Sequence, residues 1–140
     1  MRKKPLARIV PICACLIGCQ SSTAPAVILP VEFSVTGEPV SPPSATIVSS
    51  GDQVVATIVR PAVCGLETGA SAALDHGTLT VTVSLISQTI ACLAVQGSLI
   101  YRVTVDGAPS GTYDAGLHFR LQGGSSPFDS TLATSRVTIP

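Results

Sequence analysis

The chain has 140 residues, of which 11% are charged and 46% are hydrophobic, and its formal net charge is zero. This length suits one domain of ordinary size, and such an apolar, weakly charged sequence is not typical of intrinsic disorder. Beyond the N-terminal stretch the basic residues are four scattered arginines, so we expect no nucleic-acid binding, which needs a clustered basic face.

Residues 1–18 have the pattern of a cleaved secretory signal peptide. A basic start at positions 2–4 precedes an apolar run from Ile9 to Ile17, and the small residue Gly18 follows. The run is about half as long as the ~20 residues that a membrane-spanning helix needs, so we expect a signal peptide rather than a transmembrane anchor. After cleavage, four arginines remain against eight Asp and Glu residues, a net charge of −4.

The segment Leu16-Ile17-Gly18-Cys19, at the end of the apolar run, resembles the lipobox of bacterial lipoproteins. The resemblance implies a diacylglycerol thioether on Cys19, cleavage after Gly18 and acylation, for example by palmitate, of the new amino group. Two or more acyl chains hold a protein stably on a membrane. Gln20 after the anchor favours the outer membrane. An ordinary signal peptide with a chance cysteine is the alternative.

Beyond Cys19 the chain has two cysteines, Cys64 and Cys92. In an exported domain two cysteines predict one disulfide, which contributes ~3–4 kcal/mol in the chain-entropy treatment. A metal site is the alternative, and it would need both histidines, His76 and His118, at spacings that match no zinc pattern. We therefore predict a Cys64–Cys92 disulfide and no metal site.

After a flexible tether at 19–26, alternating apolar and polar residues predict short strands through a domain at 27–140. Pro30 cannot donate to a strand ladder, so the first strand should lie at an edge or pair only after this residue. His76 and Gly77 lie in a predicted hairpin loop, where Gly77 suits a positive φ. The predicted strands are 27–36, 45–49, 53–60, 69–74, 78–86, 98–105, 112–121 and 133–139.

Seven to eight short strands without a helix predict an all-β fold, an antiparallel β-sandwich of immunoglobulin-like size. The segments Leu99–Gly107 and Ser110–Tyr113 resemble the last hairpin of bacterial immunoglobulin-like modules. This resemblance implies that Tyr113 acts as the tyrosine of a tyrosine corner, with its hydroxyl bonded to backbone upstream. If Cys64 and Cys92 pair, they tie the two outer ends of the 69–86 hairpin.

No residues converge on a recognisable chemistry, so we predict neither catalytic residues nor a cofactor. Asp75 and His76 are adjacent in a turn, which we interpret as solvent-exposed. Asp114 and His118 share a strand face but lie about 13 Å apart, so they cannot pair. Asp106 and Asp114 flank the loop at 106–113, where no other acidic or positioning group supports them.

Exposed aromatic platforms, which sugar-binding modules often use, are also not expected. Phe33, Tyr101, Tyr113 and Phe119 occupy inward positions in the alternating pattern, which leaves Phe128 in a predicted loop. A carbohydrate-binding module is therefore disfavoured.

The sequence as a whole predicts a lipid-anchored protein of the cell envelope, with a non-catalytic binding or structural β-sandwich module. Its partners would be the membrane, through the anchor, and an envelope protein. The alternative is an exported inhibitor or an accessory subunit of a larger envelope complex, in which the loop at 87–95 offers apolar residues such as Ile90, Leu93 and Val95.

Overall fold

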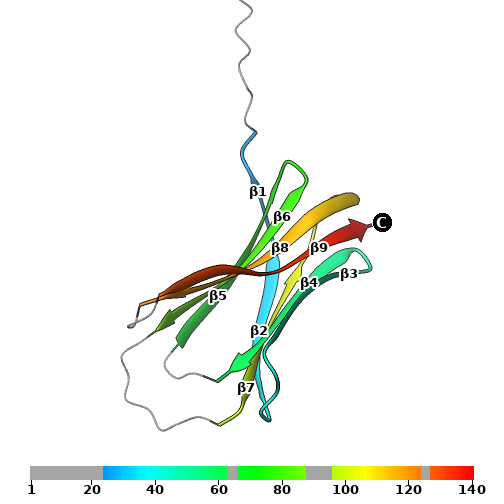
Figure 1. Ribbon diagram of the computed structural model, residues 1–140. Helices are drawn as coiled ribbons and strands as arrows, with labels where there is room; N and C mark the ends of the chain where they lie inside the picture. Colours follow the sequence, from blue (N-terminus) through cyan, green and yellow to red (C-terminus); the bar gives the residue numbers. More distant parts are fainter. Residues whose placement is uncertain (1–23, 63–65, 88–95, 124–126) are drawn as a thin grey trace, which may run out of the picture.

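The computed structural model of the chain describes residues 24–62, 66–87, 96–123 and 127–140 (Figure 1). Within these ranges the chain forms nine strands and no helix, so the predicted all-β class is confirmed. The strands are β1 (Val27–Leu29), β2 (Val31–Glu38), β3 (Ser44–Ser50), β4 (Gln53–Pro61), β5 (Leu66–Asp75), β6 (Thr78–Ser87), β7 (Ser98–Val105), β8 (Gly111–Gln122) and β9 (Phe128–Ile139).

The strands form two sheets that pack face to face. One sheet has the order β1-β5-β6-β8-β9 and the other the order β2-β7-β4-β3. All pairs are antiparallel except β6 and β8, which are parallel, so the expectation of a wholly antiparallel sandwich is wrong. The chain returns through β7, which belongs to the other sheet, and therefore enters β8 in the same direction as β6. The immunoglobulin-like topology is not confirmed.

The first predicted strand, 27–36, is two strands in two different sheets. β1 pairs with β5, whereas β2 pairs with β7. Pro30 lies between them, and its carbonyl accepts a hydrogen bond from the Asp106 amide at 3.1 Å. Because proline has no amide hydrogen to continue a ladder, the chain changes sheet at this residue. Both β1 and β2 are edge strands, as the position of Pro30 predicted.

The core lies between the two sheets and follows the predicted alternation. In β6 every second residue, from Leu79 to Leu85, is at most 1% exposed. Each such aliphatic side chain contributes roughly 1.5–3 kcal/mol by its burial. β4 is central in its sheet, and its inward residues Val54, Ala56 and Ile58 are buried. The other buried apolar residues of the core are Leu29, Ile47, Ala72, Tyr101, Val103, Val105, Ala108, Tyr113, Ala115, Leu117, Phe119, Val137 and Ile139.

The predicted hairpin between residues 99 and 113 is wrong, but the predicted role of Tyr113 is confirmed. β7 pairs with β2 and β4, while β8 pairs with β6 and β9, so the connection crosses from one sheet to the other. The Tyr113 hydroxyl donates a hydrogen bond to the Pro109 carbonyl at 2.6 Å. This bond ties the start of β8 to the crossing loop, as in a tyrosine corner.

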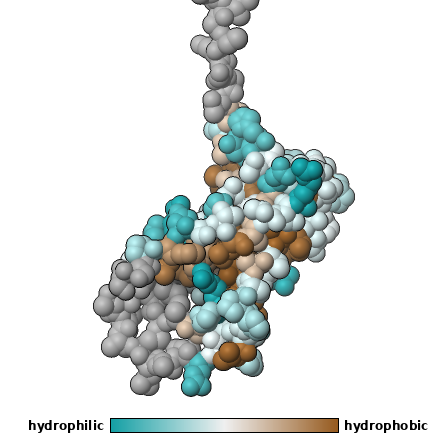
Figure 2. All heavy atoms as spheres, viewed as in Figure 1, coloured by the Kyte–Doolittle hydropathy of each residue, from teal (hydrophilic) through white to brown (hydrophobic). Residues whose placement is uncertain are grey.

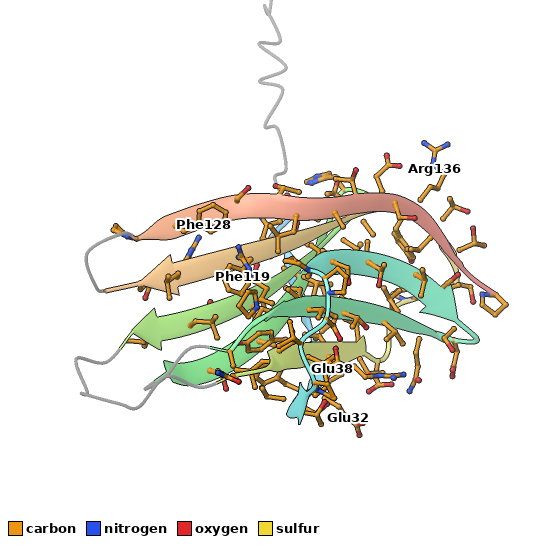
Figure 3. All side chains as sticks on the ribbon, turned by 60° about the horizontal axis from the view of Figure 1, so that its bottom comes forward. Glu32, Glu38, Phe119, Phe128 and Arg136 are labelled. Atoms are coloured by element: carbon orange, nitrogen blue, oxygen red, sulfur yellow. The ribbon has the colours of Figure 1, made fainter. Side chains whose placement is uncertain are left out.

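The sandwich has two ends, which we call the entry end and the far end. The chain enters β1 at the entry end, where β4, β6 and β8 begin (Figure 1). β4, β6 and β8 finish at the far end, where β7 and β9 begin. Figure 3 shows Arg136 toward one end of β9, and Phe119 and Phe128 toward the other. In the space-filling view, apolar residues form a band across the middle of the visible face (Figure 2).

Candidate functional site

The three cysteines predicted to be functional, Cys19, Cys64 and Cys92, lie outside the described residues. The predicted hairpin between the last two is confirmed and is longer than expected. β5 and β6 pair from Asp75 and Thr78 at the turn to Leu66 and Ser87 at the open end. The backbone therefore brings Leu66 and Ser87 together, and the disulfide stays a prediction.

Asp75 and His76 form the exposed turn that the sequence predicted. The Asp75 carboxylate contacts the His76 Nδ1 atom, and the two side chains are 58% and 63% exposed. His76 and Gly77 have φ values of 46° and 82°, and positive φ at both central residues is what a type I′ hairpin turn requires. The local backbone accounts for this pair without a catalytic role.

The polar residues of the outer face of β8 also find separate partners. Arg136 donates from Nε to Asp114 at 3.1 Å, and Arg120 donates from Nε to Asp129 at 3.0 Å. His118 lies 3.4 Å from the Thr131 hydroxyl through Nε2. Asp114 and His118 thus do not pair, as predicted, and these exposed ion pairs contribute little to stability.

Asp106 and Asp114, the second pair of acidic residues considered, are also held by different groups. Asp106 accepts a hydrogen bond from the Gln53 side-chain amide at 2.5 Å, while Asp114 pairs with Arg136. In the described ranges, no three His, Cys, Asp or Glu side chains gather closely enough to hold a metal ion. The same part of the chain contains no helix that is long and apolar enough to cross a membrane.

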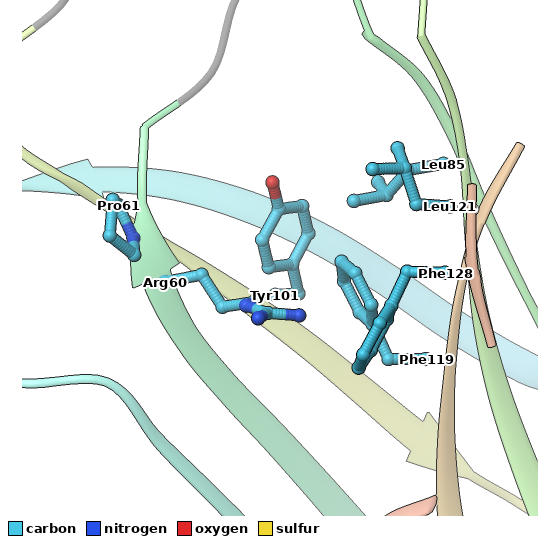
Figure 4. Close-up of a pocket in the computed structure, with 7 residues that line it drawn as sticks. All are labelled: Arg60, Pro61, Leu85, Tyr101, Phe119, Leu121 and Phe128. Atoms are coloured by element: carbon cyan, nitrogen blue, oxygen red, sulfur yellow. The ribbon is translucent and has the colours of Figure 1, made fainter. Parts of the chain in front are cut away.

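A pocket of about 340 Å³ opens between the two sheets at the far end (Figure 4). Its size falls in the range of small-molecule sites, roughly 300–1,000 Å³. One wall comes from the four-stranded sheet and contains Arg60 and Pro61 at the end of β4 and Tyr101 on β7. The opposite wall comes from β6, β8 and β9 and is formed by Leu85, Phe119, Leu121 and Phe128. We call these seven residues the far-end pocket.

The Arg60 guanidinium reaches across the pocket and stacks on two aromatic rings. Its central carbon lies 4.6 Å from the Phe119 ring centroid and 5.5 Å from that of Phe128. The two phenyl centroids are 6.2 Å apart, and Tyr101 meets Phe119 edge to face at 6.3 Å. A cation over an aromatic face is attracted by the ring quadrupole, so these rings hold the guanidinium in place.

Arg60 differs from the arginines of the outer sheet face in its partners. Arg120 and Arg136 are exposed and each pairs with an aspartate, whereas Arg60 is partly buried. Among the residues whose side chains the structure describes, no carboxylate pairs with Arg60. The far-end pocket thus combines an apolar lining with one positive charge.

Tyr101 is the second polar group of the far-end pocket, although the residue is only 1% exposed. Burial raises the pKa of its hydroxyl, and the nearby Arg60 charge partly opposes this rise. In Figure 4 the hydroxyl points away from the guanidinium. The phenol therefore stays neutral at physiological pH, and among the described residues that line the pocket Arg60 is the charged one.

Sequence reasoning missed this pocket. Phe119 was correctly predicted to face inward, but Phe128 was expected in a loop and instead begins β9, where it is 40% exposed. In β9 only Val137 and Ile139 are buried, and a bulge opposite Leu117 and His118 shifts the register of its first part. Arg60 on β4 stacks on rings from β8 and β9 of the opposite sheet. A local sequence pattern does not indicate such a contact.

Comparison of the chain with known protein families, with curated proteins and with solved structures finds no match. A functional assignment therefore depends on the residues themselves.

Proposed function

We propose that this chain is a lipid-anchored protein of the cell envelope whose β-sandwich is a non-catalytic binding module. One observation carries the binding part of the proposal. The far-end pocket lies at the end of the sandwich opposite to the one where the chain enters β1 (Figure 1). A lipid on Cys19, followed by a tether at 19–26, would hold the entry end near the membrane and leave the pocket facing away from it.

The lining of the pocket supports binding rather than catalysis. Five of its seven side chains are hydrocarbon, and the other two are Arg60 and the neutral phenol of Tyr101. A catalytic site needs a nucleophile or a general base positioned by a further polar group. The histidines and the aspartates described above are held elsewhere, on the outer face and at the entry end.

The membrane part of the proposal is tested by metabolic labelling with an alkyne analogue of palmitate. We expect label on the wild-type protein in the outer-membrane fraction, as Gln20 predicts, and loss of label in Cys19→Ala. The matched control is Cys13→Ala, which changes another cysteine of the signal segment and leaves the lipobox intact. An unlabelled wild-type protein that is released in soluble form would overturn the anchor.

The disulfide between Cys64 and Cys92 belongs to the same proposal, since it requires an exported, oxidising location. The pairing of β5 with β6 out to Leu66 and Ser87 supports it. Intact mass spectrometry tests the bond: reduction should add one hydrogen to each of two sulfurs. Equal masses before and after reduction would show that the two cysteines are not bridged.

The alternative, an accessory subunit of a larger envelope complex, is favoured by one edge of the five-stranded sheet. β1 pairs only with Ala72, Ala73 and Leu74 of β5. In the described part of the chain, the preceding residues 69–71 have a partner strand only on the β6 side. A strand of a partner protein could add to this open edge. A stoichiometric partner in pull-downs from solubilised membranes would favour the subunit, and its absence the independent module.

A further inference from the structure

We propose that the far-end pocket binds a small organic carboxylate with an apolar body, whose carboxylate pairs with the edge of the Arg60 guanidinium. This inference rests on the proposed binding function and narrows it to a ligand class. It follows from the shape of the pocket, the orientation of its one cation and the distribution of charge over the domain.

The size and lining of the pocket define the apolar body of the ligand. A volume of about 340 Å³ is at the lower end of the range for small-molecule sites. Leu85 and Leu121 from one sheet face Pro61 and Tyr101 from the other. This space suits one ring or a short alkyl chain, whose burial against these side chains favours binding because it removes apolar surface from water.

The stacking of Arg60 defines the polar end of the ligand. The Phe119 and Phe128 rings lie against the guanidinium at 4.6 and 5.5 Å. A guanidinium carries its five N–H donors in its own plane, so stacking leaves the donors at its edge available. This planar fork matches the two oxygens of a carboxylate, with which arginine forms bidentate hydrogen bonds.

The charge distribution points to an anionic ligand rather than a neutral one. Residues 19–140 carry four arginines against eight carboxylates, a net charge of −4. Despite this excess, no carboxylate among the described side chains pairs with Arg60, while Arg120 and Arg136 each have one. A partly buried cation that has no carboxylate partner among the described side chains favours binding of an external anion, because desolvated charges are stabilised by pairing.

The first experiment compares two ligands that differ only in their polar end: 3-phenylpropionate and 3-phenyl-1-propanol. The protein is purified as the cell makes it and placed in lipid nanodiscs, and binding is measured by isothermal titration calorimetry against empty nanodiscs. We expect the carboxylate to bind at least about tenfold more tightly than the alcohol, since a charge-assisted hydrogen bond is worth that factor. Equal affinities, or no binding of the acid at 10 mM, would overturn the proposal.

The second experiment uses Arg60→Met, with Arg102→Met as its matched control. Arg102 is exposed on β7 of the same sheet and does not line the far-end pocket. We expect Arg60→Met to weaken 3-phenylpropionate binding at least about tenfold and to leave the alcohol unaffected, while Arg102→Met changes neither. Equal losses in both variants would show a general charge effect and contradict a site at Arg60.

Failure of this inference and failure of the proposed function are distinguishable. If Arg60→Met does not fold, the comparison of acid and alcohol on the unaltered protein still decides between the ligand classes. If the protein carries the palmitate label but binds neither compound, the envelope location is supported and this ligand class is contradicted. If the protein binds the acid but lacks the label, the binding pocket is supported and the lipid anchor is contradicted.

Discussion

The entry end and the far end of the sandwich are closed in different ways. At the entry end, hydrogen bonds hold the turns and the crossings between the sheets. The Asp106 amide donates to Pro30, the Asp114 amide to Gly77 and the Tyr113 hydroxyl to Pro109. At the far end a backbone hydrogen bond also joins Ala62 to Gly97. There, however, a pocket opens between the two sheets, and a guanidinium stacked on two phenyl rings occupies part of the space between them.

This difference indicates which end is available for binding. The polar groups at the entry end already form hydrogen bonds with one another. A ligand there would gain little binding free energy, because a new hydrogen bond would replace an existing one. The far-end pocket instead presents apolar side chains and a cation that an external molecule could contact without breaking an internal ion pair among the described residues. The contrast leads to four predictions.

The largest expected effect on stability is at a far-end glycine. Gly97 has φ of 133°, and an added Cβ would lie 2.9 Å from the Glu38 carbonyl oxygen. Gly97→Ala therefore combines backbone strain with a clash against backbone, and we expect a loss of roughly 2–5 kcal/mol in the free energy of unfolding. Urea denaturation measures this loss.

Gly77→Ala is the matched control at the entry end. Its φ of 82° is strained for alanine, but a Cβ there meets nothing within 4 Å, so we expect a loss of only about 1–2 kcal/mol. If the two variants are equally destabilised, steric crowding at Gly97 does not contribute and the account of the far-end backbone is wrong.

A smaller effect is expected from removing the tyrosine corner. Tyr113→Phe loses the hydroxyl that donates to Pro109 at 2.6 Å, and we expect a loss of about 0.5–1.5 kcal/mol, the usual contribution of one hydrogen bond. Thermal unfolding followed by circular dichroism provides the measurement. An unchanged midpoint would show that the bond does not hold the crossing between β7 and β8.

Arg60→Met should have a still smaller effect on stability. The substitution replaces the guanidinium by an apolar side chain of similar length and removes a stacking interaction worth about 0.5–1 kcal/mol at a partly exposed site. The midpoint of urea unfolding should therefore shift only slightly, in contrast to the large effect on carboxylate binding. Destabilisation as severe as that of Gly97→Ala would mean that Arg60 is mainly a structural residue.

The smallest effect at neutral pH is expected from Tyr101→Phe, and it should grow in alkaline solution. Burial raises the pKa of the Tyr101 hydroxyl above its ordinary value of 10.0, and the Arg60 charge partly offsets this rise. The raised pKa favours the neutral phenol in the folded state. The resulting stability is fully present below about pH 10 and is lost as pH rises through the folded-state pKa.

Unfolding at pH 8 and at pH 11 tests this expectation on wild type and Tyr101→Phe. The wild type should lose more stability between the two pH values than the variant, which has no hydroxyl to ionise at this position. A loss of the same size in both proteins would assign the alkaline effect to other groups.

Much of the fold could be predicted because strand alternation is a local signal. The predicted inward residues of β6, β7 and β8 are buried, except Leu99 and Leu121, which are partly buried. The predicted strand at 98–105 has the observed bounds. Strand order was not predictable, because pairing depends on contacts between distant segments. Three features depend on such long-range contacts: the change of sheet at Pro30, the crossing after Val105 and the parallel pairing of β6 with β8.

The far-end pocket was the least predictable feature, for the same reason. Arg60 ends a predicted strand whose two faces are both fairly apolar, and nothing in its neighbours indicates an aromatic partner. Phe119 and Phe128 reach it from the opposite sheet. By contrast, the role of Tyr113 was implied by the resemblance to immunoglobulin-like modules, and its partner Pro109 lies in the adjacent loop.

The most direct test of a binding site in the far-end pocket is to locate the residues that a carboxylate contacts. We would titrate 3-phenylpropionate into the isotope-labelled protein and follow backbone and arginine side-chain resonances by NMR. We predict that the largest shifts occur at Arg60, Tyr101, Phe119 and Phe128, with little change at Asp75, Gly77 and Asp106 at the entry end. Shifts concentrated at the entry end, or none at either end, would contradict a binding site in the far-end pocket.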